Sequence, residues 1–148
     1  MIVLRKKGNI FDSQQPAMAH GVNTHGIMGA GLAKEVRRRM PDVYDIYKNA
    51  CRSRELNPGG ILPVYSVSGL WVFNLATQEA PGKNAKYDLI EETFKKAFSY
   101  MDRMGIQGIA VPKIGSGIGG LEWAQVEKII IRLGDPYPAL FVEFWERD

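Results

Sequence analysis

The hydrophobic and polar positions of this chain switch repeatedly between the pattern of a strand and the pattern of a helix. Short apolar runs predict strands over 2–4, 16–22, 61–67, 70–76, 107–111 and 140–145. In the segments between them, apolar residues recur every three or four positions, which predicts amphipathic helices over 32–40, 42–53, 87–104 and 123–133. Such alternation is typical of an α/β layered domain with a largely parallel central sheet.

Two glycine-rich turns interrupt this pattern, each placed where a predicted strand feeds a helix. Gly26 to Gly31 follows the strand over 16–22, and Gly115 to Gly120 follows the strand over 107–111. Glycine allows positive φ and lets main-chain N–H groups approach a ligand closely. A helix that begins at such a turn adds unpaired N–H donors and the positive end of its dipole. Because ligands of parallel sheets bind at the carboxyl ends of strands, the two turns predict one site for two phosphates.

Length and composition limit what surrounds this site. The 148 residues predict a single domain over 1–148, and 45% hydrophobic and 24% charged residues are ordinary for a globular protein. The single cysteine, Cys51, fits a reducing compartment. The N-terminal residues lack the apolar run of a signal peptide, and no apolar stretch approaches the ~20 residues of a membrane span. We therefore expect a cytoplasmic protein that does not contact a membrane, with a monomer as the default.

The charge pattern allows two interpretations. The net charge is only +3, but basic residues cluster at 5–7, 34–39 and 83–86. These clusters are either solvated helix faces and loops or a surface that attracts a polyanion such as nucleic acid. An RNA- or DNA-binding module would also need aromatic residues interleaved with the basic ones, and no run of that kind occurs.

Other motifs carry less weight. The second glycine turn formally fits the G-x-G-x-x-G dinucleotide fingerprint, but only one further strand is predicted after it. His20 and His25 are joined by no cluster of Cys, His or carboxylate ligands, so we expect no metal and no cofactor. Nothing in the pattern brings Ser116, His25 and Asp12 together as a catalytic triad.

Three segments in fixed order resemble the macro domain family. They are Gly8-Asn9-Ile10 after the first strand, residues 23–33 around the first glycine turn, and residues 112–123 around the second. The resemblance spans essentially the whole chain and implies a three-layer α/β/α sandwich with a mixed, largely parallel sheet that binds ADP-ribose. Within the family, the residues of the two glycine motifs resemble most the branch that contains terminal ADP-ribose protein glycohydrolase and the antitoxins that remove ADP-ribose from DNA.

The resemblance also implies where the ligand lies. The diphosphate and distal ribose would contact main-chain N–H groups of two loops, matched here by Gly26, Met28, Gly29, Ala30, Gly31 and Leu32, and by Ile114, Gly115, Ser116, Gly117, Ile118, Gly119 and Gly120. Asn9 stands where the family has an adenine-binding aspartate, so adenine would be held without charge assistance. Ile10 would add a backbone N–H and apolar contact. Phe144 and Trp145 either form an aromatic wall beside the ring or pack in the core.

The catalytic positions depart from the branch. Asn23 either bonds the hydroxyls of the distal ribose or closes an Asx-type turn before the glycines. The branch places a lysine after a threonine, whereas here Thr77 is followed by Gln78, and Gly119 stands where the glycohydrolase has an acid.

Two functions remain open. The first is hydrolysis, by a positioned water, of ADP-ribosylated protein or nucleic acid or of ADP-ribose-1″-phosphate. The second is a non-catalytic module that reads or scavenges ADP-ribose.

Overall fold

The computed structural model describes residues 1–147 and contains six strands, four α-helices and one short 3₁₀ helix. In chain order these are β1 (Ile2–Lys7), η1 (Ile10–Asp12), β2 (Ala17–Val22), α1 (Gly31–Arg39), α2 (Pro41–Arg52), β3 (Ile61–Tyr65), β4 (Trp71–Ala76), α3 (Tyr87–Met104), β5 (Gly108–Val111), α4 (Trp123–Leu133) and β6 (Phe141–Glu146).

The strands form one mixed sheet in the order β1-β6-β5-β2-β4-β3. All neighbouring strands run parallel except β3, which pairs antiparallel with β4 through a short turn. The parallel strands therefore point their carboxyl ends toward one edge of the sheet. β2 lies between β5 and β4 and pairs with β4 in parallel, with His20 in register with Asn74.

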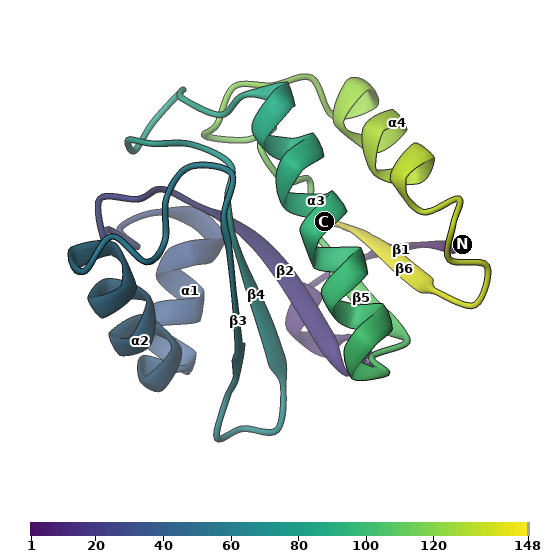
Figure 1. Ribbon diagram of the computed structural model, residues 1–148, viewed down its shortest axis with the longest axis horizontal. Helices are drawn as coiled ribbons and strands as arrows, with labels where there is room; N and C mark the ends of the chain where they lie inside the picture. The colour runs from purple at the N-terminus through teal and green to yellow at the C-terminus, as the bar shows by residue number, and fades with distance from the viewer. Residues whose placement is uncertain (148) are drawn as a thin grey trace.

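Helices cover both faces of the sheet, which gives the three-layer α/β/α sandwich expected from the sequence (Figure 1). α1 and α2 lie on one face, where Met18 and Val22 of β2 join their core. α3 and α4 lie on the other face, where Ala17 and Ala19 of β2 join a second core. The period-2 alternation along β2 thus divides one strand between two hydrophobic layers.

The predicted elements agree with the observed ones except at some ends. The predicted bounds of two helices, 87–104 and 123–133, are those of α3 and α4. Pro41 ends α1 as expected, and it also occupies the first turn of α2, where its missing N–H costs nothing. β1 extends to Lys7, beyond the predicted Leu4, because residues 5–7 continue the parallel pairing with β6 while their charged side chains remain exposed. η1 was not predicted.

Among residues 1–147, no helix combines the length and the apolar character that crossing a membrane requires.

Candidate functional site

A cavity of about 370 Å³ opens at the carboxyl ends of β2, β4 and β5. Both glycine loops contribute to its wall, as the sequence predicts. The loop after β4 closes a third side. The lining residues are 20–23, 27, 29–33, 77–78, 81–82, 112–115 and 117–119.

The first loop, residues 23–30, is held in shape by the buried side chain of Asn23. Its Oδ1 accepts from the backbone N–H of His25 at 3.0 Å and of Ile27 at 3.4 Å, and its Nδ2 donates to Ile27 O at 2.8 Å. The hydroxyl of Tyr47 in α2 donates toward Asn23 O at 2.8 Å and Oδ1 at 3.0 Å. The Asx-type turn is therefore present, and one Nδ2 hydrogen of Asn23 remains for a ligand.

The first loop leads directly into α1, whose amino end faces the cavity. Gly31 opens the helix with a φ of 57°, a conformation that favours glycine. Ala30 precedes the helix, and no side chain among the described residues caps its first turn. The N–H groups of Leu32 and Ala33 have no acceptor within a helix that begins here, and both residues line the cavity. This end of the cavity suits an anion.

The second loop, residues 114–120, is held by main-chain bonds and close glycine contacts. Leu121 N donates to Gly115 O at 2.9 Å, and Ala85 N donates to Gly119 O at 3.3 Å. A Cβ at Gly119 would lie 2.7 Å from Gly115 O and 2.8 Å from the Cβ of Ala85. The loop conformation therefore leaves no space for an acidic side chain at position 119.

The second loop does not lead directly into a helix, in agreement with the predicted start of the next helix at residue 123. Leu121 and Glu122 follow it, and α4 begins only at Trp123. The N–H groups of this loop therefore do not belong to the first turn of a helix, and a ligand bound to them would not lie at the positive end of a helix dipole. Ile118 reaches across to the start of α1, since a Cβ on Gly31 would lie 3.4 Å from its Cδ1.

Two polar side chains in the cavity floor have unsatisfied atoms. His20 Nδ1 and Thr77 Oγ1 are buried and find no hydrogen-bond partner among residues 1–147. Both residues line the cavity. Gly21 makes room for Thr77, because a Cβ there would lie 2.8 Å from Oγ1 and 3.1 Å from Ile114 Cγ1. Buried polar atoms of this kind are rare in native proteins and mark a place where a ligand or water completes the bonding.

The imidazole of His20 is neutral. Its Nε2 lies 2.7 Å from Asn74 Oδ1, and Asn74 Nδ2 donates to Leu62 O at 2.9 Å. Asn74 Oδ1 can only accept, so the proton lies on Nε2 and Nδ1 carries the free lone pair. Burial lowers the pKa of His20 to about 4, although the bond to Asn74 opposes the shift.

Gln78 lines the cavity but uses its amide to hold the neighbouring loop. Its Nε2 donates to Ala80 O at 2.7 Å and to Gly82 O at 3.1 Å. The same loop is fixed by Asn84, whose Oδ1 accepts from the N–H groups of Glu79 and Ala80. At the position of the branch's lysine, this chain therefore has a residue that shapes the wall of the site.

Several residues predicted to bind the ligand do not line this cavity. The side chain of Met28 is fully buried in the core under α1 and α2, and Gly26 lies against α2. Ser116 donates to Ile114 O within its own loop. Gly120 packs against the Lys83 side chain.

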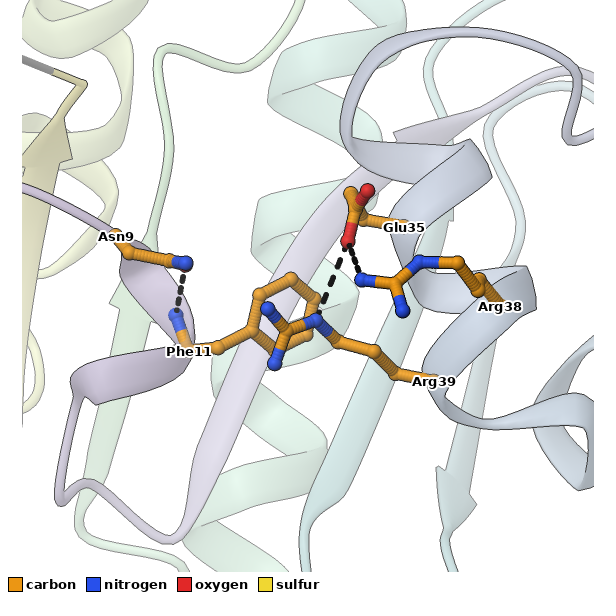
Figure 2. A network of polar contacts seen from close by, with 5 residues as sticks. All are labelled: Asn9, Phe11, Glu35, Arg38 and Arg39. Carbon is orange, nitrogen blue, oxygen red and sulfur yellow. Dashed lines mark hydrogen bonds and ion pairs between the residues drawn. The ribbon is translucent and has the colours of Figure 1, made fainter.

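The predicted adenine-binding residues do not line the cavity, and they lie together where the segment after β1 meets the end of β6. Asn9 caps η1, where its Oδ1 accepts from Phe11 N at 3.0 Å (Figure 2). Ile10 is buried, and the indole of Trp145 donates to Glu143 at 3.0 Å. Phe144 is buried and packs edge-on against Trp123, so it belongs to the core. The Phe11 ring is covered by the Arg39 guanidinium at 4.3 Å, which ties this segment to α1.

Sequence reasoning missed some of the lining residues. They include His20, Gly21, Val22, Ala33, Pro81, Gly82, Pro112 and Lys113. His20 and Gly21 belong to a strand read only for its apolar pattern, although their place near its carboxyl end points to the site. Lys113 lies at the rim and pairs with Glu146 at 2.8 Å. Residues 1–147 contain no group of three or more His, Cys, Asp or Glu side chains arranged to hold a metal.

The comparisons with known proteins agree with this geometry. The macro domain family model matches residues 19–130, so the chain belongs to the macro domain family. A DNA ADP-ribosyl glycohydrolase of Thermus aquaticus is 31% identical over 144 residues. The alignment covers 94% of this chain but only 39% of that relative, so the chain spans about two-fifths of its length.

Solved structures show the same fold over nearly the whole chain. The macrodomain of Thermus aquaticus DarG superposes with a TM-score of 0.90 at 26% identity and covers 98% of both chains. Thermosipho africanus DarTG in complex with ADP-ribose superposes with a TM-score of 0.86 at 26% identity. That match covers 97% of this chain and 42% of the DarTG chain.

Proposed function

We propose that this chain binds ADP-ribose in the cavity between its two glycine loops. The observation that carries the proposal is the pairing of these loops across one cavity, with the open amino end of α1 on one side and Gly115 to Gly119 on the other. Main-chain N–H groups from both sides suit a diphosphate. The Thermosipho africanus complex with ADP-ribose supports the choice of ligand.

Within this proposal, some of the sequence-predicted contacts keep their roles. Asn23 offers its remaining Nδ2 hydrogen to the distal ribose, and Thr77 Oγ1 offers an unused hydroxyl at the floor. Asn9, Ile10 and Trp145 remain the predicted surroundings of the adenine. A single domain, a monomer and a cytoplasmic location likewise remain predictions.

We further propose that the chain hydrolyses an ADP-ribose derivative, and the name of the Thermus aquaticus relative favours ADP-ribosylated DNA among the candidates. Among the lining residues, His20 and Lys113 have ionisable side chains, and Lys113 is paired with Glu146. The reaction would therefore depend on main-chain donors that stabilise developing charge and on a water held by the phosphates of the substrate.

The alternative is a module that binds ADP-ribose without turning it over. Two observations favour it. Gln78 holds a loop instead of offering a charged amine, and the backbone contacts of Gly119 exclude an acid.

Calorimetric titration with ADP-ribose tests the binding proposal, with NAD and AMP titrated alongside. We expect micromolar binding of ADP-ribose and much weaker binding of both controls. If ADP-ribose fails to bind, or if NAD binds as tightly, the proposed ligand is wrong.

A second experiment separates the enzyme from the reader. ADP-ribosylated oligonucleotide, ADP-ribosylated protein and ADP-ribose-1″-phosphate are each incubated with excess protein, and released product is followed by mass spectrometry. Product from one substrate identifies the bond that is cleaved. Tight binding of ADP-ribose with no product from any substrate would support the reader.

A further inference from the structure

We propose that the outer face of α1 and α2 binds a single nucleic-acid strand that leads away from the cavity. The face, called here the basic face, consists of Arg37, Tyr44, Lys48, Arg52 and Arg54. The inference rests on the proposed function, because it names the part of the substrate that the ADP-ribose would be attached to.

The positive charge of the chain is concentrated on this face. Residues 34–54 contain seven basic and three acidic side chains, a net +4, whereas the whole chain carries +3. Two of the three acids are engaged elsewhere. Glu35 pairs with Arg38 and Arg39, and Asp42 accepts from Val67 N and Ser66 Oγ. Asp45 is exposed on α2 and is the one acid of the segment left to oppose the field.

The cations of the basic face are available to a partner. Arg37, Lys48, Arg52 and Arg54 are all exposed, and none has a carboxylate within salt-bridge distance in the part of the chain that the structure describes. Tyr44, Lys48 and Arg52 follow one another at intervals of four residues, so they form one row along α2. Such a row can follow successive phosphates of a strand.

The basic face also offers a stacking surface. The Arg37 guanidinium lies over the Tyr44 ring at 4.3 Å, and Lys48 Nζ lies 6.0 Å from the same ring. A guanidinium that lies over an aromatic ring can present its outer side to solvent, and unstacked bases pack on arginine and aromatic planes. Phosphate contacts combined with a stacking plane favour a single strand over a merely acidic peptide.

The basic face adjoins the first loop, which forms one wall of the cavity. A Cβ on Gly26 would lie 3.9 Å from Lys48 Cγ and 3.8 Å from Cys51 Cβ, so α2 borders the first loop. α1 and α2 together form the outer layer on this side of the sheet (Figure 1). A strand attached to a ligand in the cavity can therefore pass Gly26 and continue along α2.

Arg54 provides independent support. It follows α2 with a φ of 62°, and it is the one non-glycine residue with positive φ among residues 1–147. Glycine would adopt this conformation with less strain. An exposed arginine at a position that favours glycine is consistent with a role for its charge, since strained residues concentrate at binding sites.

The test measures binding of an unmodified, fluorescein-labelled single-stranded DNA by anisotropy over a series of salt concentrations. The test variant is Arg37→Gln with Lys48→Gln. The matched control is Arg103→Gln with Lys95→Gln on α3, which removes the same charge and also an arginine that lies over a tyrosine, Tyr100. Each single-strand phosphate contact contributes about 0.7 to the slope of log K against log salt, so the test variant should lose about 1.4.

At 0.1 M salt that loss of slope corresponds to about 25-fold weaker binding, whereas the control should bind as the unchanged protein does. Arg54→Gly provides a variant that cannot fail by unfolding, because it should raise Tm while weakening strand binding. Equal losses in test and control variants, no loss in either, or equally tight binding of a charge-matched acidic peptide would each overturn the proposal.

The test is independent of the ADP-ribose site. Free ADP-ribose is titrated into the same variants by calorimetry, and its affinity should not change in any of them. If ADP-ribose does not bind the unchanged protein, the proposed function fails, whatever the strand does. If ADP-ribose binds and the strand does not, only the basic face is wrong.

Discussion

The two glycine loops face each other across one cavity but are held in shape by opposite means. The first loop depends on side chains, because Asn23 and Tyr47 supply the bonds that close it. The second depends on the lack of one, because Gly119 lies against backbone and the Ala85 methyl. The first should therefore fail when a side chain is removed, and the second when one is added.

The largest expected effect is a loss of ADP-ribose binding when a carboxylate is introduced into either loop. Gly29→Glu and Gly117→Glu each place a carboxylate where the diphosphate should lie. Two like charges about 5 Å apart near a protein surface repel by about 3 kcal/mol, so ADP-ribose should bind about 100-fold more weakly or worse. Calorimetry measures the loss, with Ser99→Glu on exposed α3 surface as a control of equal charge. Unchanged affinity in both glycine variants would remove the site from this cavity.

Asn23→Ala tests the dependence of the first loop on side chains. The change removes the bonds from Asn23 to His25, Ile27 and the Tyr47 hydroxyl, and it should lower the free energy of unfolding by about 2 kcal/mol. Urea denaturation measures the change. Asn49→Ala, at an exposed position in α2, is the matched control and should be nearly neutral.

Gly119→Ala tests the opposite dependence of the second loop. The added methyl would lie 2.7 Å from Gly115 O, so the loop must shift, and overpacking of this kind costs about 1.5 kcal/mol. Gly117→Ala in the same loop is the control, because its Cβ meets no described atom within 4 Å. Equal denaturation midpoints for the two variants would contradict the proposed role of close packing.

The smallest expected effect measures the contribution of the Tyr47 hydroxyl to stability separately from that of Asn23. Tyr47→Phe keeps the ring in the core but removes the hydroxyl that reaches Asn23 O and Oδ1, at a cost of about 1 kcal/mol. Tyr65→Phe, with a side chain that is 61% exposed, should change nothing measurable. If the two variants unfold alike, the Tyr47 hydroxyl does not support the first loop.

The sequence predicted the fold well because periodicity is a local signal. The helix stripes of 87–104 and 123–133 place α3 and α4 within their observed bounds. The pattern did not predict η1, a short helix that is capped by Asn9. It also ended β1 too early, because the charged residues 5–7 form strand through their pairing with β6.

The candidate site was predicted less completely, because several of its features depend on residues far apart in the chain. Glycine spacing was enough to find both loops. The bond from Tyr47 to Asn23 joins residues 24 positions apart, and no local pattern predicts it. Met28 illustrates the converse, since its place inside a binding motif did not reveal that its side chain is fully buried.

The buried imidazole of His20 gives the fold and the site different responses to acid. Native His20 stays neutral down to about pH 4, while the unfolded chain takes up that proton near pH 6.5. The unfolded state therefore binds more protons across this window, and native stability is lost as the pH falls through it. Main-chain amides do not titrate there. Mild acid should thus deplete the folded population while the molecules that remain folded still hold their ligand.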